Sequence, residues 1–224
     1  SSGWWSRGLI PRLSWRYSND AFFSFREGRY QDYQHITLGV QYFQVQRMTK
    51  RNIFPKWGYG ANIQYNMMPF AGENFGSTLY ANGYGYMPGL LKNHGIKVSA
   101  AFQKQFYDGK RYLMRNIAPS PRGYSQHFSI TYASVFTDYA FPVYLGDLTL
   151  SRYLYLKRAQ IIPFFDWAYS QGMNDFRHMY SYGSDFLIDF NIFNISLPLT
   201  AGVRYIRTGE NRDAFQLVFQ TPLL

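Results

Sequence analysis

The sequence contains no cysteine and no long apolar run, and acidic residues are few. Without cysteine, the chain can have neither a disulfide framework nor a thiolate metal site. No stretch approaches the roughly 18 consecutive apolar residues that a transmembrane helix needs, which excludes that way of crossing a membrane. No signal peptide precedes the first expected strand, so we expect the sequence to be a mature or trimmed form.

The 13 acidic residues face 23 lysines and arginines, which gives a net charge of +10. A surplus of this size is one mark of nucleic-acid binding. The basic residues, however, are scattered singly at alternate strand positions and in loops, rather than gathered on one helix face or in a tail. This distribution fits binding to the phosphates of lipopolysaccharide or to an acidic protein partner at least as well, and we expect no nucleic-acid partner.

Aromatic residues are abundant: they make up 21% of the chain, with 21 tyrosines, 20 phenylalanines and 5 tryptophans. An ordinary soluble domain has no use for so many amphipathic rings. A transmembrane β-barrel does, because apolar residues face the lipid and aromatic girdles mark the membrane interfaces. The composition therefore predicts an antiparallel up-and-down barrel in a bacterial outer membrane, with the bilayer as a partner.

Hydrophobic residues recur with a period of two along most of the chain. In 56–66, Trp57, Tyr59, Ala61, Ile63 and Tyr65 alternate with glycine, asparagine and glutamine. Segments 34–46, 95–106 and 182–192 share this rhythm, which is typical of a strand between lipid and a polar lumen. The alternative, a soluble β-sandwich, would favour aliphatic cores and shorter strands. The strands that we predict are 9–17, 20–26, 34–47, 56–66, 75–87, 95–106, 126–142, 152–169, 179–193, 196–207 and 213–221.

Loop lengths predict an orientation, since outer-membrane barrels have short periplasmic turns and long extracellular loops. The longer polar connections are 27–33, 67–74, 107–124, 170–178 and 208–212, whereas 194–195 is a tight turn. Eleven strands would place the two ends of the chain on opposite sides of the membrane. Either 9–26 is one bent strand, or residues 1–7 end a preceding strand. We favour the second interpretation, with 11–12 strands visible in 1–224 as the C-terminal part of a barrel of up to 16 strands, so that N-terminal strands and any periplasmic domain are missing.

One motif points to a kind of barrel. Loop 107–124 ends in Pro121-Arg122-Gly123-Tyr124, the next strand ends in Asp138-Tyr-Ala-Phe-Pro142, and the following strand contains Phe164-Phe165-Asp166. Taken alone, the triplet Arg-Gly-Tyr is a loop turn with a solvated arginine. The ordered set resembles the C-terminal half of the BamA/TamA-like barrel superfamily, whose members insert or translocate proteins at the outer membrane. Five strands follow the motif loop, as in that superfamily.

The resemblance implies that the loop folds into the lumen and brings Arg122 to Asp166 and Asp138. A guanidinium in a narrow lumen needs carboxylate partners, because leaving it unpaired would be costly. Asp166 has inward parity, since Phe165 and Trp167 take the lipid face. Asp138 has the wrong parity if Tyr132 points outward, so we expect a bulge near Ala133–Ser134 that turns Asp138 inward.

A second resemblance covers nearly the whole chain. It is carried by Phe54-Pro-Lys-Trp-Gly58, Met87-Pro-Gly-Leu90, Leu154-Tyr-Leu-Lys-Arg158 and Gly202-Val-Arg-Tyr205, among other short runs. These look like the barrel domains of Bacteroidota outer-membrane proteins in which a TolB-like propeller precedes the barrel. The end of the chain, Phe219 followed by Gln220-Thr-Pro-Leu-Leu224, departs from the terminal-aromatic signal common in outer-membrane proteins.

Catalytic and metal-binding sites find little support. Ser125 and His127 lie two positions apart but fit a hydrolase dyad poorly, and the histidines lack metal-ligand spacing. Asp185 and Asp189 share the lumen face and, with Arg204, are better interpreted as a lumen charge network. We therefore expect no enzyme, no metal and no cofactor.

Two non-enzymatic functions remain open from the sequence. In the first, the barrel is a scaffold or module of an outer-membrane protein assembly or translocation complex, with other outer-membrane or periplasmic subunits as partners. In the second, it is a porin-like channel for small solutes, plugged by its own loop.

Overall fold

The structure, a computed structural model, describes residues 4–24, 29–48, 52–69, 74–126, 128–151, 154–172, 175–192 and 199–220. Within these ranges the chain is all-β and contains no helix, and so none that is long and apolar enough to cross a membrane. The strands are β1 (Trp5–Ser24), β2 (Arg29–Gln46), β3 (Gly58–Met67), β4 (Ser77–Pro88), β5 (Gly95–Phe106), β6 (Thr131–Ser151), β7 (Leu154–Gln171), β8 (Phe176–Ile192), β9 (Leu199–Thr208) and β10 (Asp213–Gln220).

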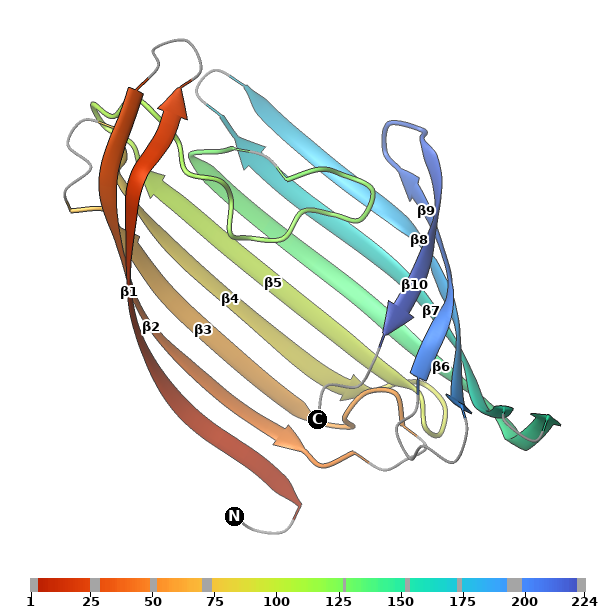
Figure 1. Cartoon of the computed structure of the whole chain (residues 1–224). Helices are drawn as coiled ribbons and strands as arrows, with labels where there is room; N and C mark the ends of the chain where they lie inside the picture. The colour runs from red at the N-terminus through yellow and green to blue at the C-terminus, as the bar shows by residue number, and fades with distance from the viewer. Residues whose placement is uncertain are drawn as a thin grey trace.

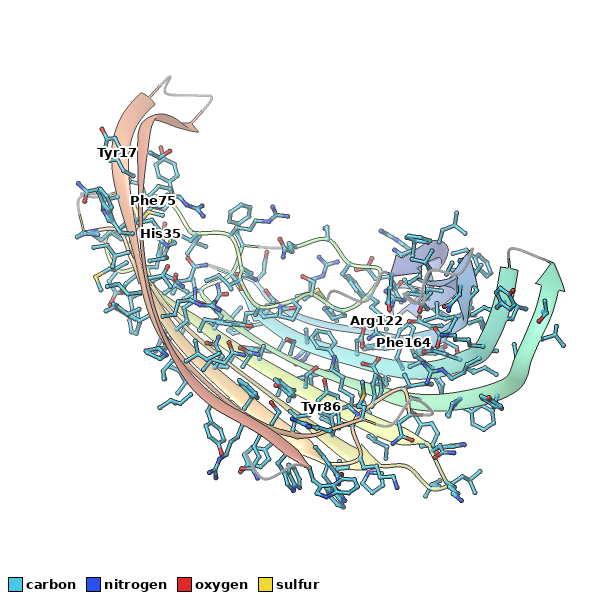
Figure 2. All side chains as sticks on the ribbon, turned by 60° about the horizontal axis from the view of Figure 1, so that its bottom comes forward. Tyr17, His35, Phe75, Tyr86, Arg122 and Phe164 are labelled. Atoms are coloured by element: carbon cyan, nitrogen blue, oxygen red, sulfur yellow. The ribbon has the colours of Figure 1, made fainter. Side chains whose placement is uncertain are left out.

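The strands form one sheet in simple chain order, β1 to β10, in which every neighbouring pair is antiparallel. The sheet curves deeply into a trough, with β1 and β2 on one wall and β8 to β10 on the other (Figure 1). Figure 2, turned from that view, shows the concave side of the trough. Among the described residues β1 and β10 do not pair with each other, so the sheet is not closed.

The predicted strands are found, with differences at the beginning and at β6. The strand predicted over 126–142 runs instead over Thr131–Ser151. Segments 9–17 and 20–26 are not two strands but one continuous strand, β1, which pairs with β2 along its length. The expected break survives as a shift in register between Ser18 and Ala21. The described residues therefore form ten strands rather than eleven, and Trp5–Arg7 belongs to β1 rather than to a preceding strand. With an even number of strands, β1 begins and β10 ends at the same end of the sheet (lower end in Figure 1).

The connections predicted to be long all lie at one end of the sheet, but they are not all longer than those at the other end. The β1–β2 connection spans 25–28 and the β9–β10 connection spans 209–212, whereas the β4–β5 connection at the other end spans 89–94. The predicted tight turn at 194–195 lies outside the described residues. The β1–β2, β3–β4, β5–β6, β7–β8 and β9–β10 connections lie at one end, here called the loop end, and the long 107–130 segment is among them. The opposite end, the turn end, carries one long connection that we did not predict, between β2 and β3. Its Asn52 carbonyl accepts a hydrogen bond of 3.1 Å from Nη1 of Arg158, and the Phe54 ring lies 5.9 Å from that of Tyr86. This connection folds over the inner face.

The period-two pattern separates an inner from an outer face, as predicted. On β7, the even residues from Gln160 to Ser170 are buried, while Phe165 between them is 51% exposed. The outer face carries large apolar side chains that stay exposed in the isolated chain. These include Leu13, Trp15, Tyr59, Ile63, Tyr180, Tyr182, Phe186, Ile188, Phe215, Leu217 and Phe219.

Aromatic rings on the outer face gather toward the two ends of the strands. At the loop end, the rings of Tyr65 and Phe106 lie 6.5 Å apart and those of Tyr169 and Phe176 lie 6.3 Å apart. At the turn end, the Tyr42 and Tyr59 rings lie 6.0 Å apart. Between these levels the register pairs smaller or aliphatic residues on the same face: Val40 with Ile63, Ile63 with Ala81, and Ala100 with Val135.

Candidate functional site: the loop-filled interior

Segment 107–130, which joins β5 to β6, lies on the concave side of the sheet (Figures 1 and 2). Two inward glutamines of β5 hold its first half. Gln105 accepts from the backbone N–H of Met114 at 2.8 Å and donates to the Met114 carbonyl at 2.6 Å and the Ser129 carbonyl at 2.9 Å. Gln103 accepts from the N–H groups of Ile117 at 2.6 Å and Ala118 at 3.2 Å. The side-chain amides thus satisfy backbone N–H and carbonyl groups of the segment that would be paired with a neighbouring strand if the segment were part of the sheet.

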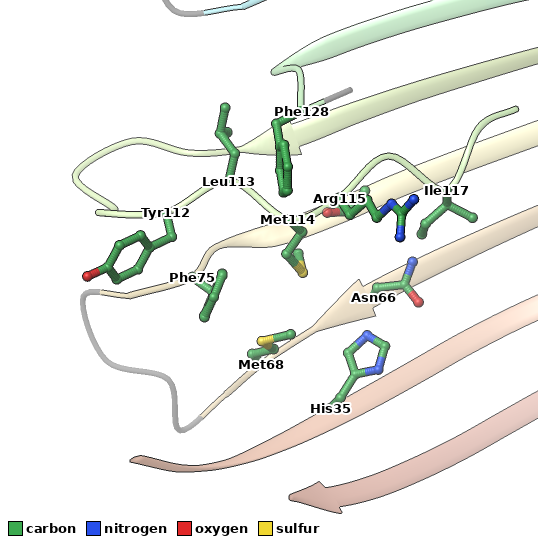
Figure 3. Close-up of a pocket in the computed structure, with 11 residues that line it drawn as sticks. His35, Asn66, Met68, Phe75, Tyr112, Leu113, Met114, Arg115, Ile117 and Phe128 are labelled. Carbon is green, nitrogen blue, oxygen red and sulfur yellow. The ribbon is translucent and has the colours of Figure 1, made fainter. Parts of the chain in front are cut away.

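Beside the segment, at the loop end, lies a cavity of about 530 Å³ between it and strands β2 to β4 (Figure 3). Two further cavities lie along the inner face. One, of about 420 Å³, is lined by Tyr80, Tyr84, Tyr86 and Pro119 among others. The other, of about 360 Å³, lies where Arg122, Arg158 and Arg204 converge. The segment therefore divides the interior without filling it completely.

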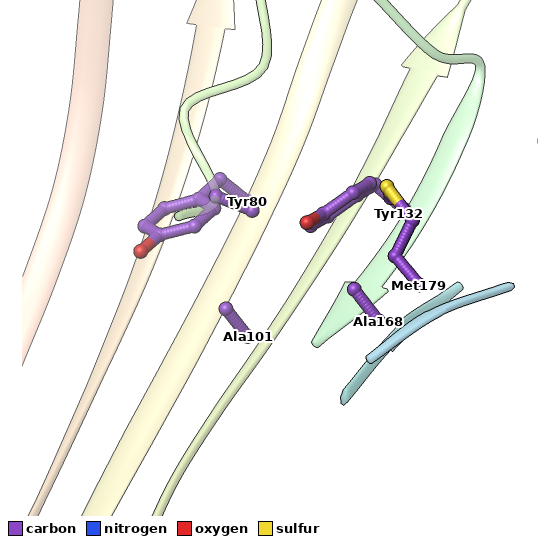
Figure 4. Packing of buried hydrophobic residues seen from close by; sticks show 6 residues of the cluster. Tyr80, Ala101, Tyr132, Ala168 and Met179 are labelled. Carbon is purple, nitrogen blue, oxygen red and sulfur yellow. The ribbon is translucent and has the colours of Figure 1, made fainter. Parts of the chain in front are cut away.

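An apolar cluster anchors the middle of the segment. Ala118, fully buried, packs with Tyr80, Ala101, Tyr132, Ala168 and Met179, which come from β4 to β8 (Figure 4). The Tyr132 hydroxyl donates to the Pro119 carbonyl at 3.2 Å, so that this ring supports the segment from below. Burying these side chains stabilises the segment against the wall in proportion to the apolar area removed from water.

Arg122 connects the segment to β6 and β7. Its Nη2 donates to Oδ1 of Asp138 at 2.6 Å, and its backbone N–H donates to Oδ2 of Asp166 at 2.9 Å. The guanidinium carbon lies 4.1 Å from the centre of the Phe164 ring, and Nε is 3.7 Å from Oδ2 of Asp166. Asp166 is fully buried. A buried carboxylate that had neither hydrogen bonds nor a nearby cation would destabilise the fold. The structure thus brings together Arg122, Asp138 and Asp166, and adds Phe164 as a cation–π partner.

The neighbours of Arg122 in the motif also have defined contacts. Pro121 is buried, and Tyr124 packs at the edge of the apolar cluster with its hydroxyl donating to the Tyr180 carbonyl at 3.3 Å. Gly123 has a φ of 85°, which side chains disfavour. A Cβ there would lie 2.8 Å from Cγ2 of Thr208 on β9. Glycine is therefore required both by the backbone turn and by the close approach of the motif to β9.

The expected bulge near Ala133–Ser134 is absent. The pairing of β6 with β7 runs in one register from Thr131 to Tyr144, and the first irregularity follows Tyr144. The prediction was wrong about Tyr132, which points inward beneath the segment rather than outward. With Tyr132 inward, Asp138 is inward by plain alternation, and no bulge is needed. Phe128 and Ile130, which suggested the opposite parity, precede the strand.

The other predicted lumen charges form two separate pairs. Arg204 donates to Asp185 through Nε at 2.6 Å and Nη2 at 2.7 Å, a bidentate pair between β9 and β8. Asp189 does not pair with Arg204. It accepts from Arg158 Nε at 2.7 Å, from Gln160 at 2.6 Å and from Thr200 at 2.6 Å. Bidentate and multiply bonded carboxylates of this kind are held in fixed geometry.

Opposite charges alternate across this part of the inner face. Lys97, Arg122, Arg158 and Arg204 line the cavity of about 360 Å³ together with Asp138 and Asp185. Asp166 and Asp189 contact two of the same arginines. Chemically the arrangement can bind polar groups and hold elements together. The predicted poor fit of Ser125 and His127 to a dyad stays a prediction, because Ser125 is exposed and His127 lies outside the residues that the structure describes.

Sequence reasoning missed Gln103, Gln105, Asn116 and Arg158. Asn116 is buried, and its Oδ1 accepts from Gln103 at 3.1 Å and from the Ser129 hydroxyl at 3.0 Å. A signal was present: two glutamines on the inward face of a strand, just before a long loop, need partners that only the loop can supply. For Arg158 the sequence carried no comparable signal, because its carbonyl partner at Asn52 is 106 residues away.

The fold and the site define a class only at the level of an all-β antiparallel sheet with its longest loop on the concave side. No family model, no curated protein and no solved structure matches the chain.

Proposed function

We propose that the chain is an integral β-barrel protein of a bacterial outer membrane that serves as a scaffold or module of a protein assembly or translocation complex. The observation that carries this proposal is that the 107–130 segment is held across the interior. Arg122 is hydrogen-bonded to Asp138 through its side chain and to Asp166 through its backbone N–H. A barrel whose interior is occupied in this way suits binding and support of other proteins better than passive flow.

Membrane insertion is supported by the two faces of the sheet. Exposed apolar side chains alternate with buried polar ones, and outer aromatic rings gather at two levels, as lipid and its interfaces demand. Unpaired strand edges are costly in hydrocarbon, so the edges of β1 and β10 would be paired in the membrane, by each other or by additional strands. Lipid and lipopolysaccharide would then cover the outer face.

The resemblance of the Arg-Gly-Tyr motif to the BamA/TamA-like superfamily supports the assembly or translocation role. Five strands, β6 to β10, follow the motif loop, and the motif arginine meets acidic residues on the first two of them. The role is non-catalytic, with other outer-membrane or periplasmic subunits as partners.

The second candidate, a loop-plugged channel for small solutes, is favoured by one observation. Cavities of about 530, 420 and 360 Å³ remain beside the segment, and the last is lined by charges of both signs. If they joined into a path, ions or small polar solutes would pass.

Conductance in a planar bilayer separates the two functions. We expect the purified wild-type protein to show no large, steady conductance, and Arg122→Ala to raise the frequency of transient openings because the segment loses its pin. Large, steady and ion-selective currents in the wild type would contradict the scaffold role and support the channel.

A further inference from the structure

The cavity of about 530 Å³ at the loop end has the features of a built binding site. Its volume lies in the range of small-molecule sites, roughly 300–1,000 Å³. Most of its lining is apolar: Met68, Phe75, Leu113, Met114 and Phe128, from the β3–β4 connection and the 107–130 segment. Figure 3 shows these side chains around one part of the cavity, with His35, Asn66 and Arg115 toward the other.

Two buried polar side chains at the cavity lack partners. Asn66 and Thr78 are each 1% exposed, and Nδ2 of Asn66 and Oγ1 of Thr78 have no hydrogen-bond partner among the described residues. The two residues are directly paired across β3 and β4, so their side chains stand next to each other on the inner face. Buried groups of this kind are nearly always satisfied, and each unsatisfied one is costly.

The orientation of the Asn66 amide shows that its unpaired atom, Nδ2, needs a hydrogen-bond acceptor. Its Oδ1 already accepts from the Thr37 hydroxyl at 2.8 Å and from Nε2 of Gln64 at 2.8 Å. Nδ2 is therefore a donor with nothing to donate to, and the Thr78 hydroxyl is a second donor beside it. Two adjacent donors match the two oxygens of a carboxylate.

The charge of the lining favours an anion. Arg115 lines the cavity, is exposed and forms no ion pair with a described residue. None of the lining residues in the described part of the chain is acidic. One guanidinium and two neutral donors suit a monoanion, whereas a phosphate dianion would call for more cations.

We propose that this cavity binds an amphiphile with a carboxylate head and an apolar chain, the class of a short or medium-chain fatty acid. The carboxylate accepts from Asn66 Nδ2 and the Thr78 hydroxyl and lies near Arg115. The chain extends among Met68, Phe75, Met114 and Phe128 toward the loop end. This site does not depend on the proposed assembly role, because it rests on residues apart from Arg122 and its partners.

The test is calorimetric titration of octanoate into the full chain in phosphatidylcholine nanodiscs, with octan-1-ol as the ligand control. We expect saturable binding of octanoate and much weaker binding of octanol. Thr78→Val keeps the shape and removes the donor, and Arg115→Gln removes the charge. Each is expected to weaken octanoate binding about tenfold, the effect of losing one hydrogen bond to a charged group. Lys92, in the β4–β5 turn at the opposite end, is also an exposed cation, and Lys92→Gln should leave the affinity unchanged.

Three results would overturn the proposal. Octanoate uptake that does not saturate, and is equal in the wild type and Arg115→Gln, would mean partition into lipid alone. Equal affinity for octanol would remove the carboxylate from the site. An equal loss of affinity in Lys92→Gln would assign binding to overall charge. Since Thr78 makes no hydrogen bond within the described chain, Thr78→Val should fold normally, and a circular dichroism spectrum verifies this before titration.

Discussion

Arg122 connects the 107–130 segment to two strands of the sheet. It joins the 107–130 segment to β6 through Asp138, to β7 through Asp166, and stacks on Phe164. Its side chain is 22% exposed and that of Asp166 is fully buried, so the attraction between them is only partly screened by water. Truncating the arginine would leave two inward carboxylates without their nearest cation.

We therefore predict that Arg122→Ala lowers the free energy of unfolding by about 2–3 kcal/mol, since it breaks a largely buried pair. The measurement is urea unfolding, together with the temperature at which the folded band disappears on a gel. Arg177→Ala is the control, because its pair with Glu210 is half-exposed and should contribute less than about 1 kcal/mol. If Arg122→Ala were no more destabilising than the control, the segment would not be pinned at this point.

Gln103 holds the segment through backbone groups rather than charge. Gln103→Leu would leave the N–H groups of Ile117 and Ala118, and Oδ1 of Asn116, without this partner. We predict a loss of about 1–3 kcal/mol, the cost of unsatisfied buried groups. Limited trypsin digestion at Arg115 should speed up accordingly. Gln44 accepts from the Tyr42 hydroxyl and has no contact with the segment in the described part of the chain, so Gln44→Leu should leave the digestion rate as it is in the wild type.

Among the elements, β8 shows how tightly the wall and the site are coupled. Gly183 pairs with Phe164 on β7 and Ile206 on β9. A Cβ at this position would lie 1.9 Å from the Tyr205 carbonyl oxygen and 2.9 Å from Cζ of Phe164. The missing side chain therefore makes room for the ring on which Arg122 stacks.

We predict that Gly183→Ala destabilises the fold by about 2–3 kcal/mol through steric overlap with backbone. The matched control is Gly83→Ala on β4, where the nearest atom to the added Cβ is 3.5 Å away. Parallel urea titrations of the two variants test this. Equal urea midpoints for the two variants would show that the backbone near Gly183 can shift to accommodate a Cβ, and that the close packing around Phe164 is not required.

The accuracy with which each strand could be predicted from the sequence depends on the residue pattern that indicated it. Period two placed the inner and outer faces of β7 and β8 correctly, because most outward positions carry large apolar residues and the inward positions include Asp166, Asp185 and Asp189. It failed on β6, because an inward tyrosine such as Tyr132 looks like an outward one until the loop that it supports is known. It split β1, because Ser18-Asn19-Asp20 resembles a turn, whereas pairing with β2 absorbs these residues as a register shift.

At the site, too, contacts that form only when distant strands and loops come together could not be predicted from the strand pattern. The resemblance implied the Arg122 contacts with Asp138 and Asp166, and alternation placed Asp185 near Arg204. The partners of Asp189 were not predicted, because a carboxylate on a strand has an equal choice of cations on either neighbour, and Arg158 on β7 is nearer than Arg204. Contacts of the β2–β3 connection with β7 depend on tertiary folding alone.

At the scale of the whole molecule, two surfaces of opposite character follow from one alternating pattern. The inner face binds the 107–130 segment and carries paired charges, while the outer face leaves large apolar side chains without cover. Large exposed apolar patches are rare on soluble monomers, and in the proposed membrane location lipid would remove this area from water. Loop, cavities and charge pairs all depend on the wall being held in this curved form.

The most direct test of this account is where the outer face lies. The chain has no cysteine, so single cysteines can be labelled with bimane one at a time. We propose Ile63→Cys and Val135→Cys on the outer face, with Asn62→Cys and Phe136→Cys as their inward neighbours, in vesicles whose acyl chains carry bromine. Strong quenching at 63 and 135 with weak quenching at 62 and 136 is the predicted result. Equal quenching within each pair, or none at any position, would contradict a membrane-spanning barrel.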